Sequence, residues 1–570
     1  MKVGFVPHAP TAIIILKYYE KNPAELCSYE ECAMKTSKKR IQICIQATLL
    51  LVCVLGVYGG SLSAPFVFDD FTLFSNSATL SKYGHGYFDF ELRWLPYASL
   101  AWTVDWLGYD RTWLRLGNVL LHGVNAITLF YLLRRLFKAT LADQDTILPA
   151  KLSWFAFFGA LIFALHPIAV YGVAYLIQRS TLMATLFMLL MLIAYLEGLL
   201  RENWRWMLIA ALFYFAAVYS KEHSVAAPGV ALALTLLVRR PSLALFKQIT
   251  PFYVVATLIA GIIVWSTLSS KGVLGAAYEP SAKGMLEQGA KLQGLSDLPD
   301  EHLLSILTQS GLFFKYLWLW LLPNPAWMSV DMRESFATSL FSWPYTFGFI
   351  WYLGYFCAAL WLLLKRGRKG LLGFALLYPW IMFLTEWSTV RIQEPFVLYR
   401  SYLWMPGLLA ALPFVFGSFV PRRAYITLGF ASVLLVPLTL NRLDSFSSNL
   451  KLWDDAEKLV RSRTGVFGIE RVYYNRGTEL GQLKRYEEAI ADFNKAIKTY
   501  PFDYVYGNRA AAYYMLGNYR EALRDYNRAI AINPENPNSY YGRSLAHGAL
   551  DNFAAAQEDI MKSCSLGVCP

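Results

Sequence analysis

The chain has 570 residues, of which 56% are hydrophobic and only 16% are charged. A soluble domain carries about 25% charged residues, so this composition excludes an ordinary soluble protein and is typical of a membrane protein. The formal net charge of +12 is one that nucleic-acid-binding proteins also show, but the basic residues lie mostly beside apolar runs. We therefore assign them to membrane orientation and expect contact with lipid and no nucleic-acid partner.

The first apolar run, 41–60, follows the basic stretch 35–40. About 20 apolar residues can span a bilayer core of about 30 Å, and no small-residue cleavage site follows, so we expect an anchor and not a removed signal. The positive-inside rule predicts that 1–40 is a cytoplasmic segment. Residues 1–33 carry no pattern, and we interpret them as an extension upstream of a natural start at Met34.

Ten further apolar runs predict an all-α polytopic domain over 41–441 with about eleven transmembrane helices. These runs are 116–136, 152–171, 180–200, 205–220, 224–238, 250–268, 345–364, 371–388, 401–419 and 424–441. Basic residues flank alternate ends, and all of them fall on the side of the N-terminal cluster. This agreement requires that 303–322, which contains Lys315, does not fully cross. We interpret that segment as re-entrant or as lying at the outer interface, and the C-terminus is then outside.

Two long loops are predicted on the outer side. The first, 61–115, contains aromatic stretches at 92–97 and 102–113 that predict amphipathic helices lying on the membrane. The second, 269–302, has Gly, Pro and Ser punctuation and no core pattern. Ionisable residues collect on this outer face: Asp69, Asp70, Arg93, His166, Arg179, Lys221, Glu222 and Arg400.

After Asn441 the composition becomes that of a soluble helical domain with a period of 33–34 residues. Small and aromatic residues recur at equivalent positions: Ala489, Phe493, Ala496 and Pro501 return as Ala522, Tyr526, Ala529 and Pro534, and a third copy begins near Tyr541. This pattern predicts three tetratricopeptide repeats over 470–570, preceded by a linker and capping helix over 442–469. We expect their groove to be lined by Asn475, Asn508, Arg509 and Tyr513 and to bind an exported protein. The alternative is that the repeats stabilise the outer loops or mediate self-association.

No glycine-rich phosphate loop and no His/Cys/carboxylate group with zinc spacing occurs in the chain. The chemistry that remains uses carboxylates and cations at the membrane surface. Asp69 and Asp70 lie in the apolar stretch 66–71, where desolvation favours a general base, and Arg or Lys on the same face can hold phosphate. These residues together favour attack of a hydroxyl on a sugar whose leaving group is a lipid-linked phosphate.

Several motifs in order resemble those of a known family. Asp69-Asp70 after a first span and 118–122 opening the second resemble the GT-C membrane glycosyltransferases. His166-Pro167, 178–180, Lys221-Glu222 and 399–406 look more specifically like the transmembrane-and-tetratricopeptide O-mannosyltransferase family and its bacterial relatives. The resemblance covers residues from about 60 to 570.

The resemblance implies that Asp69 and Asp70 are the catalytic pair and that the donor is a sugar on a polyprenyl or dolichyl phosphate. The other candidate substrate-binding residues are Arg93, His122, His166, Arg179, Lys221, Glu222 and Arg400. Relatives often carry Glu a few residues after His-Pro, where this chain has Tyr171, so a mechanism that uses that acid is in doubt. A divalent metal is compatible with the reaction, but the residues name no ligand set.

Each candidate also has a structural interpretation. Asp69 and Asp70 can form a solvated turn, His122 can be a hydrogen-bonded core residue, and His166 can belong to a helix end. Lys221 and Glu222 can form an interfacial ion pair. Arg179 and Arg400 can reach lipid headgroups.

The leading hypothesis is transfer of a sugar to a hydroxyl of an exported protein, for example Ser/Thr O-glycosylation of a pilin or another surface protein. The alternatives are a non-catalytic scaffold that displays the repeats, and transfer to a lipid or polysaccharide. The short array favours a bacterial inner membrane with the site and repeats on the periplasmic side. Cys564 and Cys569 can pair there or stay unpaired.

Overall fold

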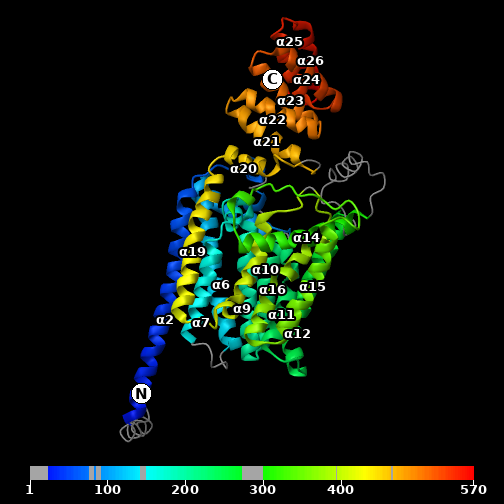
Figure 1. The fold of residues 1–570 in the computed structure, drawn as a ribbon. Coiled ribbons are helices and arrows are strands. Elements are labelled where there is room, and N and C mark those ends of the chain that lie inside the picture. The colour runs from blue at the N-terminus through cyan, green and yellow to red at the C-terminus, as the bar shows by residue number, and fades with distance from the viewer. Residues whose placement is uncertain are drawn as a thin grey trace, which may run out of the picture.

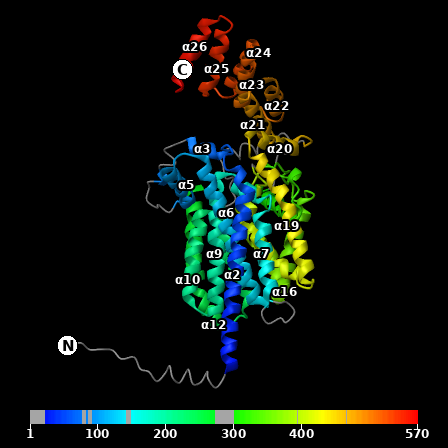
Figure 2. The same ribbon diagram turned by 90° about the vertical axis from the view of Figure 1, so that its left-hand side faces the viewer.

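The computed structural model describes residues 23–75, 82–84, 91–141, 149–271, 300–392, 394–463 and 466–569. These residues form an all-α protein, in which a bundle of long helices carries a series of short helix pairs at one end (Figures 1 and 2). We call that end of the bundle the array end and the opposite one the basic end. Within the described residues, the one isolated β-bridge joins Met332 and Phe396 at the array end. The second outer loop expected at 269–302 lies mostly outside the described residues, as does most of 1–33.

The bundle contains twelve helices of twelve residues or more among the described residues: α2 (Pro23–Tyr58), α5 (Trp94–Leu107), α6 (Arg111–Leu141), α7 (Pro149–Ala164), α9 (Arg179–Arg201), α10 (Trp204–Ser220), α11 (Ala227–Val238), α12 (Leu243–Lys271), α14 (Glu301–Leu321), α15 (Tyr345–Leu364), α16 (Gly367–Phe383) and α19 (Pro421–Ser445). The array end also carries shorter elements: α3 (Asp69–Ser75), α8 (Ala169–Val173), and the 3-10 turns η2 (Leu176–Gln178), η3 (Glu222–Ala226), η5 (Leu384–Ser388) and η6 (Leu398–Arg400). The single helix α5 occupies the region where two surface helices were expected, and Gly108 ends it.

Seven helical segments in the described residues are long and apolar enough to cross a membrane: Arg40–Ser61, Arg111–Leu141, Leu176–Arg201, Leu243–Ser266, Tyr345–Leu364, Gly367–Ser388 and Pro421–Ser445. Three further apolar helices are shorter: Lys151–Ala164, Trp204–Ser220 and Glu222–Val238. The predicted span 401–419 is divided into α17 (Ser401–Trp404), η7 (Met405–Ala411) and α18 (Leu412–Phe416). The predicted span 152–171 is shorter than expected because its helix ends at Ala164, before Pro167.

Basic residues from different segments meet at the basic end. The Lys151 amine donates to the carbonyl oxygens of Gly417 and Phe419 (2.8 and 2.6 Å), and the Arg366 guanidinium donates to the carbonyl oxygen of Arg239 (2.6 Å). Helix α2 extends past the bundle at the same end (Figure 1). The clusters that the sequence predicted to share one side therefore do lie at one end of the bundle.

Helix α14 makes its polar contacts with the array end along its whole length. Near its start, His302 Nε2 lies 2.5 Å from the Trp387 carbonyl oxygen in η5. Near its end, the Trp320 indole donates to Ser401 Oγ (2.9 Å), and the Trp320 carbonyl lies 3.1 Å from His166 Nε2. Both ends of α14 thus lie at the same end of the bundle, which agrees with the interpretation of 303–322 as a segment that does not cross.

The helix pairs form three consecutive repeats after a capping helix, α20 (Asn449–Val460). The repeat helices are α21 (Ile469–Gln482), α22 (Tyr486–Thr499), α23 (Asp503–Met515), α24 (Tyr519–Ile532), α25 (Pro537–Gly548) and α26 (Phe553–Ser565). In each repeat an arginine of the first helix donates two hydrogen bonds to an aspartate of the second: Arg476 to Asp492, Arg509 to Asp525 and Arg543 to Asp559. Arg509, expected in the groove, therefore binds Asp525 of its own repeat, and it also donates to Asn494 of the preceding repeat.

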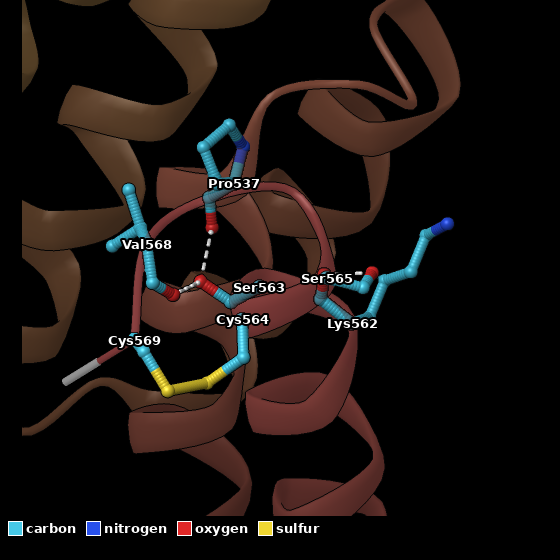
Figure 3. Close-up of a disulfide and its surroundings, with 7 residues drawn as sticks. All are labelled: Pro537, Lys562, Ser563, Cys564, Ser565, Val568 and Cys569. Atoms are coloured by element: carbon cyan, nitrogen blue, oxygen red, sulfur yellow. Dashed lines mark hydrogen bonds between the residues drawn. A yellow bond between two sulfur atoms is a disulfide. The ribbon is translucent and has the colours of Figure 1, made fainter.

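The last turn of the array is closed by a disulfide between Cys564 and Cys569 (Figure 3). The neighbouring Ser563 hydroxyl donates to the carbonyl oxygens of Val568 and Pro537 (2.7 and 3.1 Å), which fastens this turn to the start of α25. Of the two alternatives for these cysteines, the structure contains the paired one.

The placement of α14 can be tested by cysteine labelling in closed vesicles. We expect single variants Glu301→Cys and Asn324→Cys to react with a membrane-impermeant maleimide from the same side. Glu301 begins α14 and Asn324 follows it, and both ends of this helix lie at the array end of the bundle. The unsubstituted chain controls for its native cysteines. Labelling of the two variants from opposite sides would contradict this placement.

Candidate active site

A small cleft opens where the bundle meets the array. Five separate segments line it. The first loop contributes Phe68 and Asp69, and Tyr175 precedes α9. Two further walls come from residues within 330–332 and 394–399, and Arg471 enters from the first repeat helix. The cleft therefore exists only when the bundle and the array are both present.

The two adjacent carboxylates of the first loop point to different environments. Asp69 is exposed and lines the cleft, whereas Asp70 is completely buried. The Asp70 carboxylate accepts hydrogen bonds from the backbone N–H groups of Val67 (3.3 Å), Leu176 (3.4 Å) and Ile177 (3.0 Å). Asp70 thus joins its own loop to the segment that begins α9.

Burial raises the pKa of Asp70 to about 7, although the three backbone donors and the nearby Arg115 oppose this rise. The geometry indicates a structural carboxylate, since both of its oxygens are already occupied and no face of it is open to a substrate.

Asp69 is paired with a tyrosine that is itself at the cleft. The Tyr175 hydroxyl donates to Asp69 Oδ2 (3.0 Å) and accepts from the Asp69 backbone N–H (3.3 Å). Burial, followed by the negative charge of Asp69, raises the pKa of Tyr175, so its hydroxyl stays protonated and remains a donor. This contact orients one carboxylate oxygen of Asp69 and leaves the other available in the cleft.

Phe68 has a left-handed backbone conformation, with φ of 49°. For a residue with a Cβ this conformation costs roughly 1–2 kcal/mol. Its ring packs 4.8 Å from the Trp453 ring of α20 and 6.0 Å from the Tyr175 ring, measured between centroids. These contacts offset the cost and fix the direction in which Asp69 leaves the loop.

Arg115, which was not among the sequence candidates, holds the approach to this loop. Its buried guanidinium donates to the carbonyl oxygens of Ala64 and Pro65, the latter at 2.6 Å. It also donates to the Ala174 carbonyl, 3.4 Å away, just before Tyr175. An arginine inside an apolar helix carries no sequence signal for such a role, because its carbonyl partners come from distant loops.

Lys221 is a buried cation beside the cleft. Its ammonium donates to Gln178 Oε1 (3.0 Å) and Thr181 Oγ1 (2.7 Å), and lies 5.2 Å from the ring centroid of Tyr399, which lines the cleft. Burial, and then the nearby positive charge of Arg93, lowers the pKa of Lys221 to about 7. Within the part of the chain that the structure describes, Lys221 forms no ion pair.

The structural interpretation expected an ion pair between Glu222 and its neighbour Lys221. Among the described residues, the two form no such pair. Arg93 of the first loop donates to Glu222 instead, with a distance of 3.0 Å from Nε to Oε2. Glu222 also lies 3.5 Å from Nδ1 of His223, whose Nε2 is 3.1 Å from Glu386. The first loop is thereby connected to η5, the turn that follows α16.

The ionic chain continues from Glu386 to the array. Glu386 accepts from Arg400 (2.8 Å), and Arg400 lies 3.6 Å from Glu394. Glu394 in turn accepts from Arg471 of α21 (3.2 Å). Arg400, a predicted substrate-binding residue, is therefore a buried member of an ion-pair chain. Burial opposes the charge on Arg400, but Glu386 and other neighbours raise the pKa of Arg400 above its usual range.

The structure does not bring His122, His166 or Arg179 to the cleft. His122 is buried in the bundle, where Nδ1 lies 2.8 Å from the Tyr402 hydroxyl and Nε2 lies 3.0 Å from the Ala164 carbonyl. His166 is buried and stacked on Trp320. Arg179 is buried and donates to the Asn118 side chain and to the Leu114 and Ser99 carbonyls, among others. All three hold helices together.

Tyr171, where an acid was expected, is buried near Arg442 (3.4 Å from the hydroxyl to Nη1). Arg442 forms an ion pair with Asp455 of α20 (3.0 Å). The carboxylate that faces this arginine thus comes from the capping helix. Among the described residues, no group of three His, Cys, Asp or Glu side chains is arranged to hold a metal ion.

Comparison with known proteins identifies the array. The tetratricopeptide repeat family matches residues 470–503 and 504–536, which are the first two repeats, and the structure adds α25 and α26 as a third helix pair. No curated protein is significantly similar to the chain. The C-terminal part is thus a tetratricopeptide array, carried by a domain with several helices of membrane length.

The division between Asp69 and Asp70 predicts different effects on stability. Three backbone N–H groups donate to the two carboxylate oxygens of Asp70, whereas an asparagine side chain has only one oxygen. We therefore expect Asp70→Asn to destabilise the detergent-solubilised chain by about 1–3 kcal/mol. Asp69→Asn keeps an acceptor for Tyr175 and is expected to unfold close to the unsubstituted chain. Thermal unfolding followed by intrinsic fluorescence compares the three. Equal destabilisation by both substitutions would contradict the assignment.

Proposed function

We propose that this protein is a membrane glycosyltransferase that moves a sugar from a polyprenyl-phosphate donor to a hydroxyl of an exported acceptor, most simply a protein. One observation carries the proposal. Asp69 is an oriented carboxylate in a cleft at the end of a bundle with helices of membrane length, and the first helix of a tetratricopeptide array, which is a peptide-binding type of repeat, lines the same cleft. The resemblance of the motifs to the GT-C family supports the same reaction.

In the proposed reaction the acceptor oxygen forms a bond to the anomeric carbon of the sugar while the bond from that carbon to the phosphate oxygen breaks. The hydroxyl proton passes to Asp69, and the electron pair of the broken bond leaves with the polyprenyl phosphate. Attack opposite the leaving group inverts the anomeric centre. Asp69 suits the role of base because the Tyr175 hydroxyl fixes its orientation. Asp70 does not suit it, because its oxygens are held by backbone donors.

Lys221 is the best candidate for holding the donor phosphate. Its two hydrogen-bond partners are neutral, and among the described residues it forms no ion pair, although Glu222 and Glu386 are near enough to favour its charged form. An anion bound there would restore the balance, and a buried ammonium favours such an anion strongly. Arg179 and Arg400 are less suitable because carbonyl, amide and carboxylate oxygens already occupy them.

The proposal includes the finer topology of about eleven crossings, with the array outside the cytoplasm. It is supported by the basic residues at the opposite end of the bundle, which the positive-inside rule assigns to the cytoplasm. The disulfide in the last repeat supports an oxidising compartment for the array, such as the bacterial periplasm.

A protein acceptor agrees better with the array than a lipid or polysaccharide acceptor does, because tetratricopeptide arrays bind peptides. A scaffold without catalysis would use the repeats as well, but it gives no reason for the oriented Asp69 in the cleft or for the buried Lys221 beside it.

Replacing Asp69 by Asn removes a base and keeps the shape of the side chain. We expect the variant to insert normally and to lose at least about 100-fold of the transfer activity. Mass analysis of exported proteins and lipids from cells that express the unsubstituted chain, Asp69→Asn, or no copy measures this directly. Asp444→Asn, which changes an exposed carboxylate in α19, is the matched control. A glycosylated product that persists unchanged in Asp69→Asn cells would overturn the proposed mechanism.

Removal of the Lys221 charge should affect the donor. We expect Lys221→Met to weaken donor binding by about 10-fold or more, and Lys221→Arg to retain more activity, because an arginine still offers charge to a phosphate. The measurement is the initial transfer rate as a function of donor concentration in detergent. A Lys221→Met variant with unchanged donor dependence would remove Lys221 from the donor site.

A further inference from the structure

The first repeat helix, α21, forms part of the cleft. Its Arg471 lines the same space as Asp69, and its guanidinium lies 5.9 Å from the ring centroid of Phe68, the residue that precedes Asp69. Burial opposes the charge on Arg471, but Asp331 and Glu394 raise the pKa of Arg471 above its usual range, so the side chain is a cation.

Arg471 contacts carboxylates of the bundle, whereas three other arginines in the first helices of the repeats bind aspartates of their own repeats. Arg476, Arg509 and Arg543 each donate two hydrogen bonds to an aspartate of their own repeat. Arg471 donates one hydrogen bond, to Glu394, while Asp331 lies 3.7 Å away, beyond hydrogen-bond distance. A guanidinium has five N–H donors, so most of those on Arg471 are open to a ligand in the cleft, within the residues that the structure describes.

Polar residues continue from Arg471 along the repeat. The Asn475 amide donates to the Arg471 carbonyl oxygen (2.8 Å), one turn further along α21. On α23, the first helix of the second repeat, the Asn508 amide donates to the Tyr474 hydroxyl (3.3 Å) and to Thr478 Oγ1 (3.2 Å). The Tyr504 ring packs edge-on against Tyr474 at 4.7 Å. We call this face, formed by Arg471, Tyr474, Asn475, Thr478 and Asn508, the acceptor face.

We propose that Arg471 is the residue that positions the acceptor, by donating to a backbone carbonyl of an extended peptide that lies along the acceptor face and ends in the cleft. The inference rests on the proposed transfer reaction and assigns its acceptor subsite. Amide and hydroxyl side chains with aromatic rings suit the backbone of an extended peptide. The face leads to Asp69 because its first residue is already in the cleft. An acceptor hydroxyl held there lies beside the base.

The charges of the cleft disfavour a phosphate as the ligand of Arg471. Arg333 pairs with Asp331, and Arg400 lies 3.6 Å from Glu394. The cleft itself is lined by three carboxylates, Asp69, Asp331 and Glu394, and one guanidinium, so it disfavours a dianion or a phosphodiester. A neutral peptide carbonyl meets no such repulsion. The donor phosphate is better placed at Lys221, on the bundle side, and the acceptor then approaches from the array side.

Deletion of the whole array would remove a wall of the cleft, so point variants are needed. The assay uses membrane vesicles from cells that produce the full chain, which supply the natural lipid-linked donor. The acceptor is a synthetic peptide that spans the modified site found by comparing cells with the unsubstituted chain and with Asp69→Asn. Transfer is measured against peptide concentration for Arg471→Gln and Arg471→Lys. Arg524→Gln, which removes an exposed arginine in α24, is the matched control.

We expect Arg471→Gln to raise the KM for the peptide about 10-fold or more, since it loses a charge-assisted hydrogen bond, and to leave the maximal rate within about 2-fold. The KM of Arg471→Lys should lie between those of Arg471→Gln and the unsubstituted chain, because a lysine keeps the charge but lacks the planar set of donors of a guanidinium. Arg524→Gln should match the unsubstituted chain. Release of free sugar from the donor to water should persist in Arg471→Gln and disappear in Asp69→Asn.

An unchanged KM for the peptide in Arg471→Gln would overturn the inference, as would a loss of maximal rate and of sugar release without a change in KM, which would indicate a role in forming the cleft. A change in donor dependence alone would assign Arg471 to the phosphate. Each of these results is distinct from failure of the proposed function, in which Asp69→Asn and the unsubstituted chain would yield the same products.

Discussion

The geometry of the cleft depends on the buried carboxylate of Asp70. It accepts backbone hydrogen bonds from its own loop and from the two residues that follow Tyr175, and so it joins segments that are more than 100 positions apart in the chain. That junction brings Tyr175 next to Asp69 and sets the turn at Phe68 in its left-handed conformation. A carboxylate with its oxygens occupied in this way is a structural element, and it allows the adjacent carboxylate to face the cleft with one oxygen open. Two neighbouring acids thereby lie in different environments.

A second constraint joins the membrane-length helices to the repeats. The ionic chain from Arg93 through Glu222, His223, Glu386, Arg400 and Glu394 ends at Arg471 of α21. His223, Glu386 and Arg400 are buried, and buried ion pairs contribute little net stability but are costly to break singly. Such a chain favours one orientation of the array over others. The packing of Phe68 on Trp453 and the Arg442–Asp455 pair act at the same junction.

The sequence predicted the elements whose signals are local. Apolar runs and their flanking charges identified the helices, and the repeat period identified the array, because each depends on residues close in the chain. Their apolar flanks also singled out Asp69 and Asp70 as candidate residues. The sequence did not predict that the two carboxylates lie in different environments, because this depends on backbone groups at 176 and 177 that reach Asp70 only in the folded protein. Arg179 and His122 looked like site residues because charge in an apolar run is unusual, yet distant carbonyl, amide and hydroxyl groups satisfy them. Arg471 was missed for the opposite reason. It lies in a repeat that appeared to be a separate domain, and only the junction brings it to the cleft.

The central claim is that transfer requires the carboxylate of Asp69 and not merely a folded cleft. Chemical rescue tests this most directly: Asp69→Ala is assayed for transfer to the acceptor peptide in vesicles with increasing formate, with Asp70→Ala as the comparison. The account predicts that Asp69→Ala is inactive without formate and regains transfer as formate rises, because a free carboxylate can enter the open cleft, whereas Asp70→Ala is not restored. Transfer by Asp69→Ala at the unsubstituted rate in the absence of formate would contradict it.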